Sequence, residues 1–374
     1  MRKLATIRKI VDLQPIPGAD AIEVATVDSW KVVVKKGEFQ LHDLVLYIEV
    51  DSWVPHELAP FLSKGQEPRE YDGIKGERLR TIKLRGQVSQ GLILPLWDSN
   101  YLVQKFARVE NVANRPYPVW VETLTENGWY VMPDGRCVES ALFELDLSES
   151  FGIVKYEPPV PACLAGVVKG SFPSCFPKTD EERIQNLTDE WPLLRTYTYE
   201  VSEKLEGSSM SVGLLSDTEF IVCSRNLNLK ETEDNTLWKV ARAYDIERKL
   251  LDVPTTGGII IQGELIGEGI QGNYYDIKGH DFYVFAIYDV GGGKYYTPAE
   301  RHELCQTLGL KHVPVIDVHA SVDMSIEDML RNADGPSIIN PMKKREGVVY
   351  KQDDGKGQAH FKTVSNDYLI STGG

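Results

Sequence analysis

One short stretch of the sequence carries residues that could perform covalent chemistry. In residues 201–209, Val-Ser-Glu-Lys-Leu-Glu-Gly-Ser-Ser, Lys204 is followed two positions later by Glu206 and then by Gly207. Side chains alternate between the two faces of a strand, so Lys204 and Glu206 would point to the same side while Leu205 enters the core. A lysine held in its neutral form can attack a phosphorus or carbonyl centre. Taken alone, however, the Lys-x-Glu-Gly pattern fits a half-buried strand end with a surface ion pair better.

The elements that position this stretch belong to a chain of globular composition. Its 374 residues predict two or three domains, and its 42% hydrophobic and 26% charged content is typical of soluble proteins. No apolar run reaches the roughly 18 residues that a membrane span needs. The five cysteines are odd in number and lack Cys-x-x-Cys spacing, which argues against a disulfide framework and a structural zinc site. The composition therefore predicts a cytoplasmic protein with no membrane association.

The net charge of −14 is unusual for a nucleic-acid-binding protein, but binding depends on local patches rather than on the total. One basic patch lies within residues 75–85, where Glu77 is the single acid. Its five cations are Lys75, Arg78, Arg80, Lys83 and Arg85. A solvated strand face and a phosphate-contacting surface fit this pattern equally well. An acidic total is also expected where carboxylates are gathered to hold metal ions.

The order of strand and turn patterns predicts four segments. Residues 1–100 contain five or six short strands and no good helix, which predicts an OB-like β-barrel, with a plain SH3-like barrel as the alternative. Residues 101–150 predict a β-rich insertion or an extension of this first domain. The proline-rich segment 151–163 predicts a stiff linker, and residues 164–374 then form the second domain.

The second domain mixes strands and helices irregularly, which predicts an α+β fold of antiparallel sheets flanked by helices. Thr179 and Glu182 have the spacing of a helix-capping box, and Thr297 and Glu300 have it again with a proline between them. The second of these helices should end near Gly309. Residues 234–251 show the helical spacing of apolar residues most clearly. Neither common nucleotide-binding glycine loop is present.

Four further motifs follow Lys204 in order, each at the end of a predicted strand. They are Ser224-Arg225-Asn226, Gly263-Glu264-Leu265-Ile266-Gly267, Arg345-Glu346-Gly347-Val348-Val349-Tyr350-Lys351 and Phe361-Lys362. Each is weak alone, but the ordered set resembles the motifs of nucleotidyltransferases that use a covalent lysine intermediate. The chain is most similar to ATP-dependent RNA ligases with an OB domain ahead of the catalytic domain. Residues 30–39, 49–52, 79–86 with 89–92, and 177–186 extend the resemblance, which covers residues 1–96 and 152–374.

The resemblance implies a reaction in three steps. Lys204 would attack the α-phosphorus of ATP, releasing pyrophosphate and forming a lysyl–AMP. AMP would then pass to an RNA 5′-phosphate, and an RNA 3′-hydroxyl would displace it. A protonated lysine cannot attack, and a nearby divalent cation would favour the neutral amine. The implied partner is RNA with such ends, including those at a nicked duplex, the implied role is RNA repair, and a monomer is expected.

The resemblance also assigns roles to the motif residues. Glu206, Glu264 and Glu346 would hold a hydrated Mg²⁺ or Mn²⁺, and Glu206 would also contact the ribose. The remaining nucleotide contacts are expected from Arg183 at the pyrophosphate, Arg225 at the ribose or incoming strand, Phe285 stacked on adenine, and Lys351 and Lys362 at the AMP phosphate. Phe285 as a core residue and Lys351, Glu264 and Glu346 as surface residues are the alternatives. The basic residues 75–85 become candidates for RNA backbone contact.

Three positions depart from the usual pattern of these ligases. Position 206 is Glu rather than Asp, Ala286 stands where Asp often follows the stacking aromatic, and His360 stands where a second lysine is common. If that lysine holds a phosphate, this protein would depend on protonation of His360 or on another donor.

Two other classes compete with this interpretation. Capping guanylyltransferases and DNA ligases share the lysine chemistry, but they normally add an OB domain after the last lysine motif, whereas only residues 363–374 follow Lys362. The second alternative is a non-catalytic OB-fold RNA-binding protein with a degenerate transferase domain. The joint presence of Lys204, Glu264, Glu346 and Lys362 argues against it.

Overall fold

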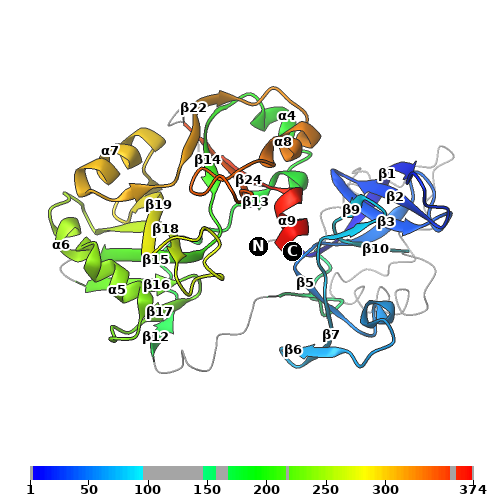
Figure 1. The fold of residues 1–374 in the computed structure, drawn as a ribbon, viewed down its shortest axis with the longest axis horizontal. Helices are drawn as coiled ribbons and strands as arrows, with labels where there is room; N and C mark the ends of the chain where they lie inside the picture. Colours follow the sequence, from blue (N-terminus) through cyan, green and yellow to red (C-terminus); the bar gives the residue numbers. More distant parts are fainter. Residues whose placement is uncertain (1–2, 96–145, 157–166, 216–218, 354–358, 373–374) are drawn as a thin grey trace, which may run out of the picture. The chain divides into compact units, whose positions relative to one another are not determined.

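The computed structural model describes residues 3–95, 146–156, 167–215, 219–353 and 359–372. The chain divides into two compact units, residues 1–158 with 370–374 and residues 159–369 (Figure 1). Most of the predicted β-rich segment, residues 101–145, lies outside the described residues, as does the prediction of a linker for residues 157–163.

The first unit is built from short antiparallel strands. Its five-stranded sheet has the order β10-β4-β1-β2-β3, and a four-stranded sheet has the order β11-β5-β7-β6. The strands of the first sheet are β1 (Ala5–Pro15), β2 (Ile22–Val27), β3 (Trp30–Lys35), β4 (Leu44–Ile48) and β10 (Leu92–Pro95). Those of the second are β5 (Ser52–Pro55), β6 (Arg69–Tyr71), β7 (Ile74–Arg78) and β11 (Val154–Lys155). The described part of the unit also contains a hairpin of β8 (Ile82–Leu84) and β9 (Gln87–Ser89) and a short 3₁₀ helix, η1 (Pro60–Ser63).

The long strand β1 connects two parts of the first unit. Residues 5–9 pair with β4, whereas residues 10–15 pair with β2. The register shifts between Ile10 and Asp12, and such a bulge bends a strand and increases its twist. One strand can therefore contribute Ile7 to one apolar cluster and Ile10 to another. This curvature is what a small barrel needs, so the sequence-based prediction of short barrel-forming strands is confirmed.

Residues 151–156 differ from the predicted linker. Phe151 and Ile153 are buried in an apolar cluster of the first unit, and β11 pairs antiparallel with β5. The prolines that indicated a linker all lie further along, outside the described residues. The signal in the sequence was the apolar pair at positions 151 and 153, which a turn with Gly152 at a positive φ of 65° brings into the core.

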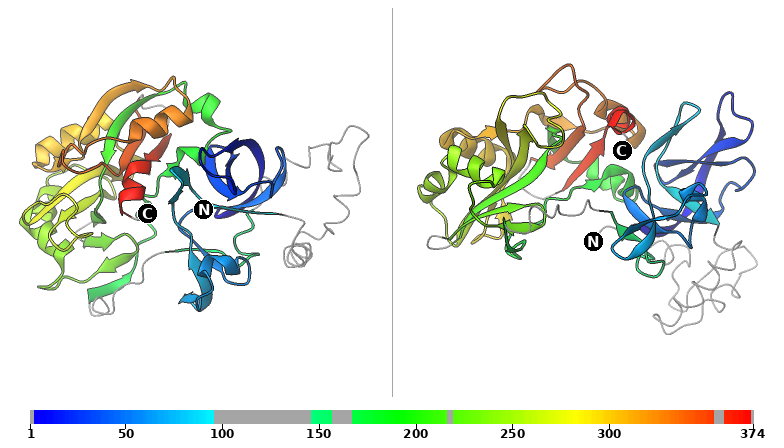
Figure 2. Two further views of the ribbon diagram at one scale, coloured as in Figure 1. Left: turned by 45° about the vertical axis from the view of Figure 1, so that its right-hand side comes forward. Right: turned by 60° about the horizontal axis from the view of Figure 1, so that its bottom comes forward.

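The second unit consists of two sheets with helices (Figures 1 and 2). The larger sheet has the order β12-β17-β16-β15-β18-β19-β20, with β21 paired to β19. Its strands are β12 (Val168–Ser171), β15 (Ser208–Leu215), β16 (Glu219–Ser224), β17 (Leu227–Leu229), β18 (Gly258–Gly267), β19 (His280–Asp289), β20 (Lys294–Tyr295) and β21 (Lys311–His312). The apolar side chains of α5 (Thr236–Ala243), α6 (Ile246–Leu251) and α7 (Pro298–Leu308) share one core cluster with this sheet.

The smaller sheet has the order β13-β24-β23-β14-β22. Its strands are β13 (Glu182–Arg183), β14 (Thr198–Lys204), β22 (Val315–Ser321), β23 (Gly347–Gln352) and β24 (His360–Val364). Its core cluster includes side chains of α4 (Trp191–Leu194) and α8 (Ile326–Ala333). Helix α9 (Asn366–Thr372) follows β24 directly. The irregular order of strands and helices confirms the predicted α+β class.

The helix predictions for the second unit had different outcomes. The capping box of Thr297 and Glu300 is present at the start of α7, and Gly309 ends that helix in the left-handed conformation, as predicted. The apolar pattern of residues 234–251 forms two helices rather than one, because Asp245 has a positive φ of 52° between them.

The predicted helix at residues 179–186 is wrong. Residues 182 and 183 instead form β13, which pairs in parallel with β24, and only the 3₁₀ turn η3 (Ile184–Asn186) follows. The Glu182 carboxylate accepts hydrogen bonds from the Arg183 amide and the Asn186 side chain, so it does not cap a helix. Pairing with a strand far along the chain therefore outweighed the local capping signal.

Candidate active site

Lys204, the central residue of the candidate site, is the last residue of strand β14. This strand lies between β22 and β23 in the smaller sheet, and Gly347 is directly opposite Lys204. The Lys204 Nζ donates a hydrogen bond to the carboxylate of Glu346, the residue just before β23. Leu205 is 4% exposed and packs in a core cluster, so the predicted alternation of faces around Lys204 is present.

Glycine at position 207 allows the two sheets to approach at this point. A Cβ there would lie 2.5 Å from the Leu265 carbonyl oxygen and 2.9 Å from the Glu264 Cγ, which is closer than real contacts allow. Glu264 lies on β18, opposite Ser209 of β15. The close passage of the chain at Gly207 therefore brings the Glu264 carboxylate towards the strand that carries Lys204.

The lysine is surrounded by an excess of negative charge. Burial by itself lowers the pKa of Lys204, but the carboxylates of Glu346, Glu264 and Glu206 outweigh it and leave that pKa raised. Burial raises the pKa of Glu264 to about 8; Lys204 opposes this effect, while the charges of Glu346 and Glu206 add to it. Burial and the charge of Glu346 also raise the pKa of Glu206. We name these four residues the acid-rich cluster.

The acid-rich cluster has the donor set of a site for a divalent cation. Glu346 accepts a hydrogen bond from the Lys204 amine, the charges of Glu206 and Glu264 act on the same amine, and the raised pKa values of Glu206 and Glu264 indicate negative charge that the amine does not fully compensate. Hydrated Mg²⁺ and Mn²⁺ prefer such oxygen ligands. Glu206 is held in place from two sides, because its carboxylate accepts a 2.6 Å hydrogen bond from the Tyr368 hydroxyl and its amide donates to the Tyr275 hydroxyl.

A second group of charges lies beside a cavity of about 440 Å³ in the same unit. Glu181 lines this cavity and accepts a hydrogen bond from His360 Nδ1, while Lys351 Nζ lies 3.9 Å from its other oxygen. Burial lowers the pKa of Lys351 to about 8, although Glu181 opposes this effect. Burial opposes ionisation of Glu181, but the hydrogen bond from His360 and the charge of Lys351 leave its pKa lowered. We name Glu181, Lys351 and His360 the base-rich cluster.

Phe285 contacts both the protein core and the cavity. Its ring packs against the cluster that contains Leu205 and Tyr275 and also lines the cavity. Lys351 Nζ lies 5.2 Å from the ring centroid and donates a 2.6 Å hydrogen bond to the Phe285 carbonyl oxygen. The two alternatives raised for this residue, core packing and ligand contact, are therefore compatible.

The remaining predicted nucleotide contacts lie in two places. Arg183 of β13 is opposite Lys362 of β24 and is 7% exposed, and the charge of Lys362 acts on Glu181. Arg225 follows β16, forms a 2.6 Å ion pair with Asp180, and its charge acts on Glu264. Arg183 and Lys362 thus belong to the surroundings of the base-rich cluster, and Arg225 to those of the acid-rich cluster.

Sequence reasoning missed Glu181 and Tyr368 as members of these sites. Glu181 lies within the stretch 177–186 that carried part of the family resemblance, but the sequence analysis predicted a capped helix there and gave Glu181 no role. For Tyr368 the sequence held no signal beyond an aromatic residue near the end of the chain.

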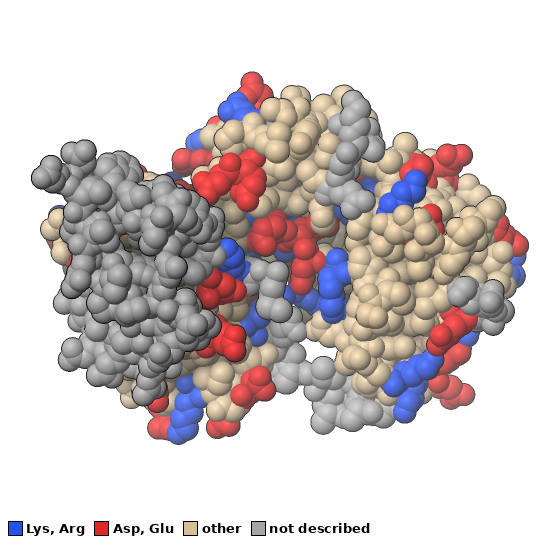
Figure 3. Space-filling model, turned by 180° about the vertical axis from the view of Figure 1, so that it is seen from behind, with Lys and Arg blue, Asp and Glu red and all other residues tan. Residues whose placement is uncertain are grey.

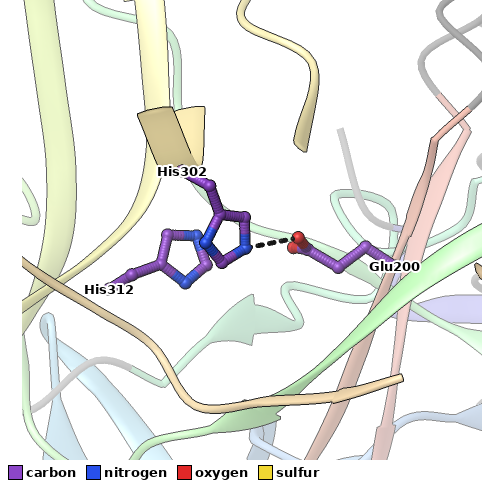
Figure 4. A group of neighbouring side chains, drawn as sticks. All are labelled: Glu200, His302 and His312. Atoms are coloured by element: carbon purple, nitrogen blue, oxygen red, sulfur yellow. Dashed lines mark hydrogen bonds and ion pairs between the residues drawn. The ribbon is translucent and has the colours of Figure 1, made fainter. Parts of the chain in front are cut away.

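A third group, formed by Glu200, His302 and His312, has ligand atoms that all lie within 4.8 Å of one another (Figure 4). Arg301 already binds two of these three groups: it donates to the Glu200 carboxylate and, over 2.8 Å, to His312 Nε2. His312 Nδ1 donates to the Val313 carbonyl oxygen, so both ring nitrogens are used. Burial and the charge of Arg301 lower the pKa of His312 to about 3. The group is a buried charge network rather than a metal site.

The five predicted RNA-contacting cations are spread over different elements of the first unit. Lys75 and Arg78 lie on β7 and pair with Glu67 at 2.9 Å and Asp51 at 2.6 Å. Arg80, Lys83 and Arg85 are exposed around the β8–β9 hairpin. On the face shown in Figure 3, Lys and Arg side chains are interspersed with Asp and Glu rather than gathered in one basic field.

Comparisons with known proteins add independent findings. A family model described as an OB-fold domain matches residues 4–96, and an RNA ligase family model matches residues 198–364. No curated protein matched the chain. Among the described residues, no helix is long and apolar enough to span a bilayer.

Solved structures of an RNA ligase from Naegleria gruberi match nearly the whole chain. A mutant without ligands is 40% identical, with a TM-score of 0.80, and the match covers 98% of this chain and 97% of that one. A mutant with ATP and Mn is 39% identical, with a TM-score of 0.79 and 98% of both chains covered. The structure with pyrophosphate is also 39% identical, with a TM-score of 0.79 and 99% and 98% covered. These matches confirm the predicted fold, an OB-fold domain followed by a ligase domain.

Proposed function

The chain belongs to the ATP-dependent RNA ligases, and on this premise we propose that it joins RNA 3′-hydroxyl and 5′-phosphate ends through a lysyl–AMP formed on Lys204. Breaks at which such ends meet, including nicks in a duplex, are the proposed substrates, and RNA repair is the proposed role. The observation that carries the proposal is the hydrogen bond from the Lys204 amine to Glu346, together with the charges of Glu206 and Glu264 that act on the same amine. A monomeric state and a cytoplasmic location stay predictions from the sequence.

The amine of Lys204 must lose its proton before it can form a bond to phosphorus. In the acid-rich cluster the three carboxylates hold the proton on Nζ, since their charges raise its pKa. The hydrogen bond to Glu346 also fixes the direction of the amine. Anything that compensates the carboxylate charge lowers this pKa and frees the lone pair. Bond formation between Nζ and the α-phosphorus of ATP then expels pyrophosphate.

We propose that Glu206, Glu264 and Glu346 hold a divalent cation, Mg²⁺ or Mn²⁺. When bound, the cation supplies the charge that compensates the carboxylates and neutralises the phosphate. Glutamate at position 206, one methylene longer than the aspartate common in this family, still keeps its charge within reach of Lys204.

The other proposed nucleotide contacts follow from their places in the second unit. Phe285 offers an aromatic face at the cavity for adenine, and Lys351 and Lys362 offer cations for phosphate. Arg183, beside Lys362, is the proposed contact for departing pyrophosphate, and Arg225 for the ribose or the incoming strand. For RNA, the exposed cations Arg80, Lys83 and Arg85, with Lys75 and Arg78 of β7, are the proposed backbone contacts.

The test is covalent labelling of the full chain. With labelled ATP and Mg²⁺ or Mn²⁺ the protein should gain one AMP, and Lys204→Ala should abolish the adduct. Lys239→Ala, an exposed lysine of α5, serves as the matched control and should label normally. An adduct that persists in Lys204→Ala would mean that another residue is the nucleophile.

Two further measurements separate the competing classes. An adduct formed from GTP rather than ATP would move the protein to the capping enzymes. Sealing of nicks that differ only in the 2′-hydroxyls at the 3′ end should require those hydroxyls, because they distinguish RNA from DNA. Sealing that ignores them would identify a DNA ligase. A protein that binds RNA but forms no adduct would be a binding protein.

A further inference from the structure

We propose that Tyr368 is a positioning residue for formation of the lysyl–AMP, because its hydroxyl holds the Glu206 carboxylate in the orientation in which Glu206 contributes to the cation site. This inference rests on the proposed function, since it concerns how the acid-rich cluster is kept ready for a divalent cation. It also gives a role to residues 365–369, which follow the last motif lysine and to which the sequence motifs assign none.

The Tyr368 hydroxyl makes a short, direct contact with Glu206. It donates a 2.6 Å hydrogen bond to the Oε2 atom of the Glu206 carboxylate, a distance typical of a hydroxyl bound to a charged acceptor. Tyr368 is only 7% exposed, so little water competes for this bond. Because the bond uses Oε2, it leaves Oε1 of the same carboxylate for a cation or for one of its water ligands.

The ring of Tyr368 is itself held on several sides. It packs edge-on against the ring of Tyr274, with 5.6 Å between the ring centroids, and it shares a buried apolar cluster with Val364 and Leu369. The Tyr368 amide donates a 3.0 Å hydrogen bond to the Ser365 hydroxyl. A hydroxyl on a ring that is fixed in this way can fix the carboxylate that it binds.

The same segment is also bound to the chain at Glu346. The Ser365 amide donates a 2.8 Å hydrogen bond to the Glu346 carbonyl oxygen. On the other side of the contact, the Glu206 amide donates a 2.8 Å hydrogen bond to the Tyr275 hydroxyl. The segment from Ser365 to Tyr368 therefore connects the backbone of one proposed cation ligand, Glu346, with the carboxylate of another, Glu206.

Glu206 depends on such support more than the other two carboxylates do. Glu346 accepts a hydrogen bond from Lys204, and Glu264 lies within strand β18. Glu206 lies between β14 and β15 and belongs to neither strand, and the negative charge of Glu346 acts against its own. Without a donor at its carboxylate, this repulsion would turn the flexible side chain away from Glu346. Its orientation would then be restored only at the expense of cation affinity.

The experiment removes the hydroxyl alone, in Tyr368→Phe of the full chain, and measures the rate of lysyl–AMP formation against Mg²⁺ or Mn²⁺ concentration. The cation concentration that gives half the maximal rate should rise about 10-fold or more, the usual result when a group that orients a metal ligand is lost. At saturating cation the rate should return towards that of wild type, because the Glu206 carboxylate is still present.

Tyr199→Phe is the matched control. Its hydroxyl also makes a buried hydrogen bond, over 2.7 Å to the Leu194 carbonyl oxygen, but its ring lies in the core cluster of the smaller sheet and outside the acid-rich cluster. The control should lower stability and leave the dependence on cation concentration unchanged. It therefore separates a general loss of stability from a loss of positioning.

A second measurement does not depend on catalysis. Denaturant unfolding without divalent cations compares wild type, Tyr368→Phe, Glu206→Ala and the double variant, which together form a double-mutant cycle. Tyr368→Phe should lower the unfolding midpoint of the wild-type protein. The same substitution should no longer lower it in Glu206→Ala, because the acceptor of the hydroxyl is then missing.

Two results would overturn the inference. One is a Tyr368→Phe protein whose rate depends on cation concentration as that of wild type does. The other is an equal loss of unfolding midpoint with and without the Glu206 carboxylate, because the hydroxyl would then not act through Glu206. Failure of the proposed function would look different, since the wild-type protein would form no AMP adduct at any cation concentration, while the unfolding cycle would still report the contact.

Discussion

The acid-rich and base-rich clusters use the same kinds of side chain in opposite proportions. Around Lys204, three carboxylates face one amine; around Glu181, one carboxylate faces Lys351 and His360. In the first cluster the pKa of Glu264 rises to about 8, and in the second the pKa of Lys351 falls to about 8. In both, burial is the largest cause, because it penalises any charge that lacks a full partner.

The difference between the two clusters indicates that they suit ligands of opposite charge. The minority charge of each cluster is stabilised: the pKa of Lys204 is raised and that of Glu181 is lowered. Among the majority charges, Glu264 and Lys351 are destabilised chiefly by burial, and a ligand that brings the missing sign would relieve them. A divalent cation meets this need at the acid-rich cluster, and a phosphate group meets it at the base-rich cluster.

The largest effect on activity is expected when the acid-rich cluster loses one of its three negative charges. Glu346→Gln removes one carboxylate and the charged acceptor of the Lys204 amine. Lysyl–AMP formation should fall by about 100-fold or more, because a catalytic metal contributes several kcal/mol. The rate measured against Mg²⁺ or Mn²⁺ concentration should also show weaker cation binding. Glu303→Gln, an exposed acid on α7, is the matched control. An unchanged cation dependence in Glu346→Gln would remove this carboxylate from the proposed metal site.

A smaller effect is expected on stability when Glu264 is neutralised. Because its pKa is raised to about 8 in the folded state, the folded protein binds more protons than the unfolded chain between about pH 4.5 and 8. The wild-type free energy of unfolding should therefore fall over this range in the presence of a chelator. Glu264→Gln removes this loss and should be more stable than wild type at pH 8, by on the order of 4 kcal/mol.

Denaturant unfolding at pH 5 and pH 8 measures this difference. The same variant should lose adenylylation activity, so stability and activity would change in opposite directions. If the difference in unfolding free energy between Glu264→Gln and wild type is the same at pH 5 and pH 8, burial does not raise the pKa of Glu264.

The smallest effect on stability is expected at the base-rich cluster, where the free energy of unfolding should change with pH in the opposite direction. The lowered pKa of Lys351 means that the folded protein binds fewer protons than the unfolded chain between about pH 8 and 10.5. Wild-type stability should gain on the order of 3 kcal/mol from this group as pH rises through that range. In Lys351→Met this gain should be absent, so the difference in unfolding free energy between the two proteins should change between pH 8 and 10. If the difference in unfolding free energy between Lys351→Met and wild type is the same at pH 8 and pH 10, the pKa of Lys351 is not lowered, and the two clusters do not differ in the sign of their pH dependence.

Several local features of this protein could be read from single stretches of sequence. The alternation of Lys204, Leu205 and Glu206 at the end of β14 and the capping box of α7 depend only on nearby residues, and both are present. Local signals were misleading where distant strands competed for the same residues. At Glu182 and Arg183, pairing with β24 replaced the expected helix, and at Val154, pairing with β5 replaced the expected linker.

By itself, the sequence determined the family, the two-part α+β architecture and the identities of the motif residues, because these depend on residue type, order and periodicity. Only the tertiary structure decided how the charges are balanced. The acid-rich cluster joins β14 and β18 with the residue before β23, and the base-rich cluster joins β23 and β24 with the residue before β13. The interaction between charges depends on their distance and burial, and neither quantity is encoded locally. The pairing of Glu181 with His360, across 179 positions of the chain, exists only in the folded protein.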